Sequence, residues 1–192
     1  INSSIEIAVL LKRANVIAIG PGLGKTDWAL NLFNAARTVQ KPMVIDADAL
    51  NILAESPVKN DCWVLTPHPG EAARLLKCSV KQIQMDRFVA VSEIQQKFGG
   101  VVVLKGAGAL IYDGNLTKIS TTGNPGMASG GMGDVLTGII AALIAQGYDL
   151  GEAAVKAVNI HGRAADRAAQ DGERGLLAGD LMFHIRKLVN QL

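Results

Sequence analysis

Four short stretches of the chain are almost continuously apolar, at residues 16–20, 43–47, 62–65 and 101–104. A strand with one solvent-facing side alternates apolar and polar residues, whereas a parallel strand covered on both faces reads as an unbroken apolar run. These stretches therefore predict four buried parallel strands.

Helical spacing occupies segments between these strands. Apolar residues recur every three or four positions in two stripes: Trp28, Leu32, Ala36 and Val39, and then Phe88, Val91, Ile94 and Phe98. Each stripe is typical of one face of an amphipathic helix, and Gly99 predicts the end of the second helix. Three further helices are expected at residues 135–146, 152–169 and 181–189, with Gly147 as a stop signal and Asp180 as a cap.

A hairpin is predicted after the fourth strand. Residues 109–113 and 116–119 flank Gly114-Asn115, a two-residue turn signal that indicates an antiparallel pair. Strands that alternate with helices indicate an α/β protein, so we expect a three-layer α/β/α sandwich with a mostly parallel central sheet and this hairpin. Ligands of such sheets bind beyond the carboxyl ends of the parallel strands.

Composition narrows the class of protein. The 192 residues are 49% hydrophobic, enough for one domain over residues 1–192 with a sizeable core. The net charge of +2 and the scattered Lys and Arg argue against nucleic acid or a membrane surface as the main partner. Two cysteines, Cys62 and Cys78, fit a reducing cytosol, so we expect a cytoplasmic protein. The longest apolar stretch, residues 135–145, is shorter than the roughly 20 residues that span a bilayer.

The segment at residues 123–147 joins a glycine-dense loop to an apolar helix. Gly130, Gly131 and Gly133 allow a sharp turn and a close approach to a ligand, and the free N–H groups of the helix start favour an anion. Phosphate repels a carboxylate, so Asp134 suits removal of a proton from a hydroxyl that attacks phosphorus. The alternative is that Asp134 only N-caps the helix predicted from residue 135.

The first predicted strand runs into GPGLGKT, residues 20–26. A Walker A loop would need glycine in place of Ile19, and a dinucleotide-binding fingerprint would need glycine in place of Lys25. What remains is a loop with Gly22 and Gly24 whose backbone could meet a phosphate or sugar, or a plain strand-to-helix turn.

The next two strands also end in polar residues. Asp46 and Asp48, with Asn51 after them, are candidate oxygen ligands for a hydrated Mg²⁺ or a ribose, although either Asp could instead cap a helix. In TPHPGE, residues 66–71, two prolines hold His68 on a rigid loop where its imidazole could donate to a phosphate or amide. Glu71 is expected chiefly to cap the following helix.

The fourth strand ends in a lysine and small residues that offer charge and open backbone to a nucleotide: Lys105, Gly106, Ala107, Gly108 and Ala109. Together with the glycine loop, they suggest that a nucleotide and a second ligand meet at a transferable phosphate. The other two histidines, His161 and His184, fall in predicted helices and are expected to be structural.

The ordered motifs GPGLG, DADALN, TPHPGE, KGAG and ASGGMGD resemble the ribokinase-like superfamily, and most closely the NAD(P)H-hydrate dehydratase family. This family is the carbohydrate-kinase-related domain of bifunctional nicotinamide nucleotide repair proteins. The resemblance covers nearly the whole chain, and it implies a ribokinase-like fold and ADP- or ATP-dependent dehydration of the S epimer of hydrated NADH or NADPH.

The resemblance also implies roles for residues. Asp134 would activate the C6 hydroxyl of the hydrate, and the N–H groups of Gly131, Met132 and Gly133 would hold the transferred phosphoryl group. The adenine nucleotide would lie on residues 105–109 and Gly133. The hydrated dinucleotide would bind His68, Asp134 and the loop with Gly22 and Gly24. Mg²⁺ would bridge nucleotide oxygens, through water near Asp46 or Asp48. A homo-oligomer, specifically a tetramer, is expected.

The chain departs from the family pattern in two places. Family members usually have Thr after KGAG, where this chain has Ala109, so one hydroxyl near the nucleotide would be missing. The chain begins with Ile1 rather than Met, and we expect it to start after the opening β-α portion of the family, which helps to form the substrate pocket. The epimerase module of bifunctional members is absent from these residues.

Two other functions are compatible with the same residues. A ribokinase-like kinase of a thiazole or pyrimidine alcohol would use the same Asp134 and anion site, although TPHPGE and DADALN favour the dehydratase. A nucleotide-binding module without turnover is the third alternative, because of Ala109 and the N-terminal start.

Overall fold

The computed structural model describes residues 4–191, so Ile1 and the expectation attached to it lie outside the described residues. Within this range, one sheet has the order β1-β2-β3-β4-β5-β6. The strands are β1 (Ile17–Ile19), β2 (Met43–Ile45), β3 (Trp63–Leu65), β4 (Val101–Leu104), β5 (Leu110–Tyr112) and β6 (Thr117–Ile119). The first four pair in parallel, and β4–β5 and β5–β6 pair antiparallel, so the predicted parallel strands and hairpin are confirmed.

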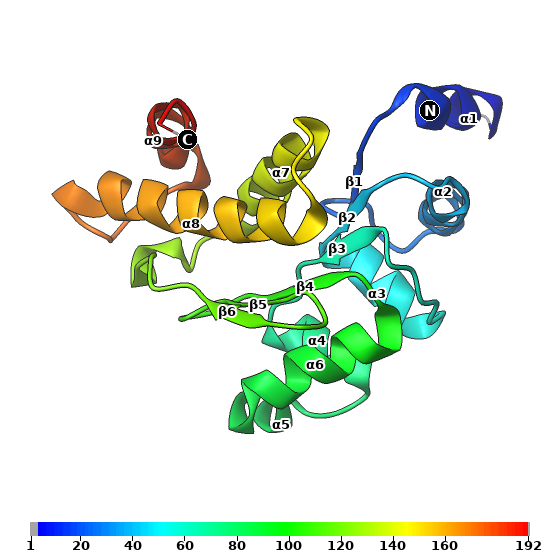
Figure 1. Cartoon of the computed structure of the whole chain (residues 1–192), viewed down its shortest axis with the longest axis horizontal. Coiled ribbons are helices and arrows are strands. Elements are labelled where there is room, and N and C mark those ends of the chain that lie inside the picture. The colour runs from blue at the N-terminus through cyan, green and yellow to red at the C-terminus, as the bar shows by residue number, and fades with distance from the viewer. Residues whose placement is uncertain (1–3, 192) are drawn as a thin grey trace.

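Helices cover both faces of this sheet (Figure 1). One apolar cluster joins the sheet to α2 (Asp27–Thr38), α3 (Ala47–Glu55), α4 (Pro69–Leu76), α5 (Val80–Met85) and α6 (Arg87–Phe98). A second cluster joins the other face to α7 (Met132–Ala145), α8 (Leu150–Ala168) and α9 (Leu181–Val189). The remaining helical elements are α1 (Ser4–Arg13), η1 (Pro125–Met127), η2 (Ala169–Asp171) and η3 (Ala178–Asp180). The three-layer α/β/α sandwich is confirmed.

The apolar runs of the central strands follow from this double cover. Met43 and Ile45 belong to one cluster and Val44 to the other, because successive side chains of a strand point to opposite faces. The outer strand β1 differs: Ala18 is exposed, so the expected burial on both faces is wrong there. No helix among the described residues is both long and apolar enough to cross a bilayer.

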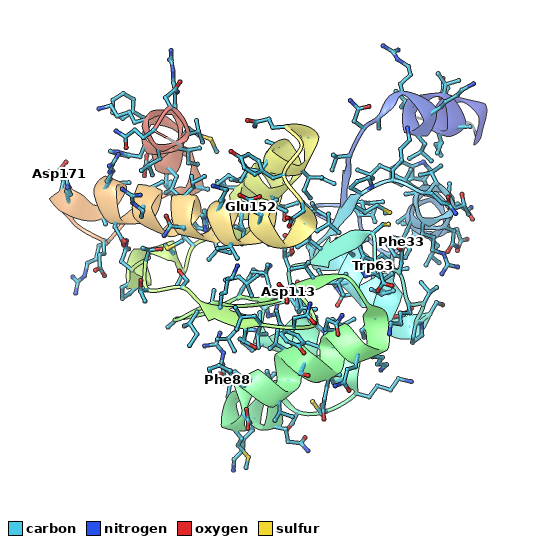
Figure 2. The ribbon with its side chains drawn as sticks, viewed as in Figure 1. Phe33, Trp63, Phe88, Asp113, Glu152 and Asp171 are labelled. Carbon is cyan, nitrogen blue, oxygen red and sulfur yellow. The ribbon has the colours of Figure 1, made fainter. Side chains whose placement is uncertain are left out.

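The two apolar stripes predicted from the sequence coincide only partly with the buried faces of α2 and α6. Trp28 is 44% exposed, and α2 instead buries Ala29, Phe33 and Ala36. Phe88, at the start of α6 (Figure 2), is 52% exposed, whereas the other three members of its stripe are buried. Spacing alone marks a helix, and the neighbouring layer decides which of its faces is covered.

Helix α8 passes very close to the loop that follows β6. A side-chain carbon added at Gly162 would lie 2.2 Å from the Thr122 hydroxyl oxygen and 2.8 Å from the Thr122 carbonyl carbon. One turn further on, the Asp166 carboxylate accepts hydrogen bonds from the Gly123 backbone N–H at 3.0 Å and from the Asn124 side chain at 3.1 Å. This loop is therefore held directly against α8.

A buried histidine lies on the same helix. His161 is 7% exposed, and its Nε2 has no hydrogen-bond partner. Burial lowers the pKa of His161 to about 4; a backbone hydrogen bond with Met132 raises the pKa, and the charge of Lys105 lowers it further. His161 is therefore neutral in the folded protein near neutral pH.

We expect Gly162→Ala to lower the free energy of unfolding by about 1–3 kcal/mol, because the added methyl group collides with the Thr122 backbone. The matched control is Gly138→Ala in α7, where nothing lies within 4 Å of the added carbon. That substitution should raise the free energy by roughly 0.5–1 kcal/mol through helix propensity. Urea unfolding measures both values, and equal effects of the two substitutions would contradict the close contact.

Acid should destabilise the wild-type protein more than His161→Gln. The folded-state pKa of His161 is depressed, so its contribution is present above the unfolded value of 6.5 and is lost as pH falls towards about 4. This shift corresponds to about 3 kcal/mol. Urea unfolding of both proteins between pH 7 and pH 4 tests the difference in slope, and parallel pH profiles would show that His161 does not titrate in this way.

Candidate active site

The polar residues that end the parallel strands lie at one edge of the sheet. Asp46, Thr66 and Lys105 stay in the hydrogen-bond ladder, since their N–H groups donate to neighbouring carbonyls at 2.8–3.1 Å. The parallel pairing of β1 to β4 therefore brings together four loops that the sequence analysis marked separately.

A cavity of about 770 Å³ opens beside this edge. Its walls are His68, residues 105–109, 120–125, 127–129 and 132–133, Leu136, Val158, His161 and Gly162. Every residue of the predicted nucleotide segment thus lines the cavity, together with His68 and two residues of the predicted anion site. The loop at residues 120–125 was not among the predicted contacts, although its Gly-Asn-Pro sequence belongs to the glycine-dense segment.

The glycine loop forms a turn into α7. Gly131 is the N-cap residue in a left-handed conformation, with φ of 84°, and its carbonyl accepts from the Val135 N–H at 3.1 Å. The helix therefore begins at Met132, three residues earlier than expected, and the N–H groups of its first turn lack partners within the helix. Met132 and Gly133 present this turn to the cavity wall.

Asp134 lies in the first turn of α7 and is exposed. The N-cap position is occupied by Gly131 without a side-chain hydrogen bond, so the alternative that Asp134 merely N-caps this helix is wrong. The αL conformation of Gly131 moves the helix start upstream. Gly131 and Asp134 belong to the same turn as Met132 and Gly133 but do not themselves line the cavity.

A buried ion pair lies behind this turn. The Asp46 carboxylate is 1% exposed; its Oδ1 is 2.7 Å from Lys105 Nζ, and its Oδ2 accepts from the Thr137 hydroxyl at 2.9 Å. Burial alone would raise the pKa of Asp46, but the charge and hydrogen bond of Lys105 and the hydroxyls of Thr66 and Thr137 hold it below its usual value. Asp46 is therefore a carboxylate despite its burial.

His68 begins α4 and lines the cavity. Its Nδ1 accepts from the Gly70 N–H at 2.9 Å, while Glu71 Oε2 accepts from the His68 N–H at 2.7 Å. This reciprocal pair is a capping box, so the expected capping role of Glu71 is confirmed. Glu71 Oε2 also lies 3.7 Å from Lys105 Nζ, which links the His68 loop to the buried ion pair.

The two candidate metal ligands point to different partners. Asp48 Oδ2 accepts from the Gly24 N–H at 2.8 Å, whereas Asp46 holds Lys105. Across residues 4–191, no group of three or more His, Cys, Asp or Glu side chains could hold a metal ion. The two carboxylates do not fit a direct metal site, and contact with Mg²⁺ through water stays a prediction.

The GPGLG loop packs on the start of α3 and lies outside the cavity lining. A side-chain carbon at Gly20 would overlap the Asp46 carbonyl oxygen at 1.7 Å, so only glycine permits this approach. Gly22 and Gly24 have φ of 63° and 73°, and nothing lies within 4 Å of an added carbon at either position. Their contact with substrate stays a prediction.

Arg87 holds the backbone of residues 104–107, and the sequence analysis did not identify it. Its guanidinium donates to the carbonyls of Ala107 at 2.6 Å, Leu104 at 3.2 Å and Lys105 at 3.5 Å. Burial lowers the pKa of Arg87, and its Nε is buried without a partner. No local signal could have found this residue, because its targets follow it by some 20 positions and are backbone atoms.

Comparisons with known proteins identify the family of this chain. The model of the NAD(P)H-hydrate dehydratase family matches residues 2–187. The bifunctional NAD(P)H-hydrate repair enzyme Nnr of Coxiella burnetii is 54% identical over 96% of this chain and 38% of its own length. The Nnr protein of Escherichia coli is 49% identical over 94% of this chain and 35% of its own length. The chain therefore spans little more than a third of these curated relatives.

Solved structures share the fold. An ADP/ATP-dependent NAD(P)H-hydrate dehydratase from Bacillus subtilis, co-crystallised with ATP and Mg²⁺, has a TM-score of 0.82 and 30% identity over 92% of this chain and 64% of its own. A hydroxyethylthiazole kinase from Pyrococcus horikoshii, 17% identical over 100% of this chain and 77% of its own, has a TM-score of 0.76 and shows the fold alone. The predicted resemblance is confirmed, and the chain belongs to the NAD(P)H-hydrate dehydratase family.

Proposed function

We propose that this chain dehydrates the S epimer of NADH or NADPH hydrate in an ADP- or ATP-dependent reaction, releasing AMP or ADP and phosphate. The observation that carries the proposal is the free helix start at Met132 and Gly133, which line the same cavity as residues 105–109. Membership of the dehydratase family favours this function over a vitamin-alcohol kinase, with which only the fold is shared.

The chemistry follows from the weakness of hydroxide as a leaving group. Asp134 takes the proton of the C6 hydroxyl, whose oxygen attacks the terminal phosphorus and displaces AMP or ADP. The C6–O bond then breaks with its electrons on phosphate, a proton leaves the neighbouring carbon, and the ring double bond is restored. The N–H groups of Met132 and Gly133 stabilise the charge that develops on the phosphoryl oxygens.

The exposed position of Asp134 leaves its carboxylate accessible to a substrate hydroxyl. Within the part of the chain that the structure describes, no other residue holds this carboxylate, and the N-cap position belongs to Gly131.

The nucleotide would bind residues 105–109 through backbone groups, which Ala109 retains in place of Thr. Mg²⁺, when bound with the nucleotide, would neutralise phosphate charge. His68 and the loop with Gly22 and Gly24 would bind the hydrated dinucleotide. We also propose one ribokinase-like domain over residues 1–192, a cytoplasmic location, and a homotetramer. Assembly is supported by large exposed apolar side chains near the C-terminus, at Leu177, Met182 and Phe183.

The function is tested by mixing the protein with hydrated NADPH, Mg²⁺ and either ADP or ATP, and following the absorbance of reduced nicotinamide. Recovery of absorbance that requires nucleotide supports the dehydratase. Phosphorylation of a vitamin alcohol, or saturable nucleotide binding without product, would contradict it.

Asp134→Asn should reduce kcat by at least about 1,000-fold and leave nucleotide affinity within a few fold, because a base acts in the transition state. The nicotinamide assay measures kcat, and calorimetry measures nucleotide affinity. The matched control is Asp171→Asn, an exposed carboxylate at the end of η2 (Figure 2), which should keep full activity. Substantial turnover by Asp134→Asn would remove the proposed base.

Arg87→Met should raise the nucleotide KM on the order of 10- to 100-fold, since three backbone carbonyls at the end of β4 and after it lose charge-assisted hydrogen bonds. The kcat at saturating nucleotide should change much less. Arg174→Met, at an exposed position, is the control and should keep the wild-type KM. An unchanged KM in Arg87→Met would show that the loop keeps its shape without this arginine.

A further inference from the structure

The Asp46–Lys105 ion pair touches the back of the anion turn. A side-chain carbon added at Gly133 would lie 3.3 Å from Lys105 Nζ and 3.6 Å from Asp46 Oδ2. The bare Cα of Gly133 therefore lies against the ion pair, and any larger residue would be forced onto it. The Lys105 side chain is 20% exposed and lines the cavity, whereas Asp46 is buried.

The ammonium group is fixed rather than mobile. A lysine side chain has four flexible carbons, and an exposed one samples many positions. Here Nζ is 2.7 Å from Asp46 Oδ1, Thr137 holds the other carboxylate oxygen at 2.9 Å, and Glu71 lies 3.7 Å from Nζ. The cation is therefore preorganised between a buried counter-ion and the cavity.

Two groups that could face an anion meet at this place, with the Asp46 and Glu71 carboxylates as the counter-charges of Lys105. The start of α7 contributes free N–H groups and the positive end of the helix dipole, and Lys105 contributes a full charge beside Gly133. A fixed cation stabilises charge that develops in the transition state without reorganising at the moment of reaction. Backbone binding of a nucleotide by residues 105–109 would not need this placement of the side chain.

We propose that Lys105 contacts the transferring phosphoryl group with its ammonium, and that Asp46 and Thr137 are positioning residues that hold the ammonium behind Gly133. This inference rests on the proposed function for the identity of the reaction. It assigns Asp46 the role of a counter-ion to Lys105 rather than that of a metal ligand.

A charge-deletion series separates this role from a merely structural one. Lys105→Met leaves Asp46 buried without its cation and is expected to destabilise the fold. The double variant Asp46→Asn with Lys105→Met removes both charges, and thermal melting should show that it folds. If the pair only stabilised the protein, the double variant would regain activity. We expect its kcat to stay about 100- to 1,000-fold below wild type.

Thr137→Val tests a smaller change, in which the ion pair keeps both charges but is positioned less firmly. It keeps the shape and both charges but removes one anchor of Asp46. We expect kcat to fall several-fold while the nucleotide KM stays close to the wild-type value. The matched control is Glu152→Gln with Lys156→Met, which removes an ion pair of 3.6 Å from the surface of α8 and should leave kcat unchanged.

A binding measurement keeps the test independent of turnover. Calorimetry of inorganic phosphate added to the AMP-loaded protein probes the anion turn directly. Phosphate affinity should fall at least about 10-fold in the double variant, with AMP affinity retained. Unchanged phosphate affinity, or recovery of kcat to within three-fold of wild type in the double variant, would overturn the inference. Absence of turnover in the wild type would reject the proposed function, and the phosphate measurement would still decide the role of Lys105.

Discussion

The site depends on the parallel pairing of β1 to β4, which places the carboxyl ends of four strands at one edge of the sheet. Three of these strands lead to a different chemical group there. β2 leads to the buried Asp46, β3 leads to His68, and β4 leads to Lys105 and residues 106–109. Because the ladder hydrogen bonds continue past β2 and β4, Asp46 and Lys105 are held by the sheet itself rather than by flexible loops.

Electrostatic contacts connect the strand ends at this edge to helix α7. A buried carboxylate is costly unless it is paired, and Asp46 is paired both to Lys105 from β4 and to Thr137 from α7. The same contact therefore ties the sheet to the helix whose first turn is the candidate phosphoryl site. Glu71 adds a weaker link from Lys105 to the His68 loop. The same linked charges would therefore act both in nucleotide binding and in transfer of the phosphoryl group.

Backbone contacts shape the rest of the cavity. Gly162 lets α8 lie directly against the loop after β6, and Asp166 then fixes that loop by two hydrogen bonds. Arg87 does the same for the nucleotide segment from the opposite layer of helices. The cavity walls are therefore positioned by residues that do not belong to the family motifs.

The amino-acid sequence by itself determined the parallel strands, the hairpin, the helices with clear apolar spacing and the glycine-rich turn before α7, because apolar runs and glycines act on the local backbone. The family motifs identified the dehydratase family for the same reason: each is a short continuous segment. Only the tertiary structure decided that Asp46 pairs with Lys105 and that Arg87 supports residues 104–107. These features depend on which strands and layers become neighbours, and segments far apart in the chain carry no local record of that.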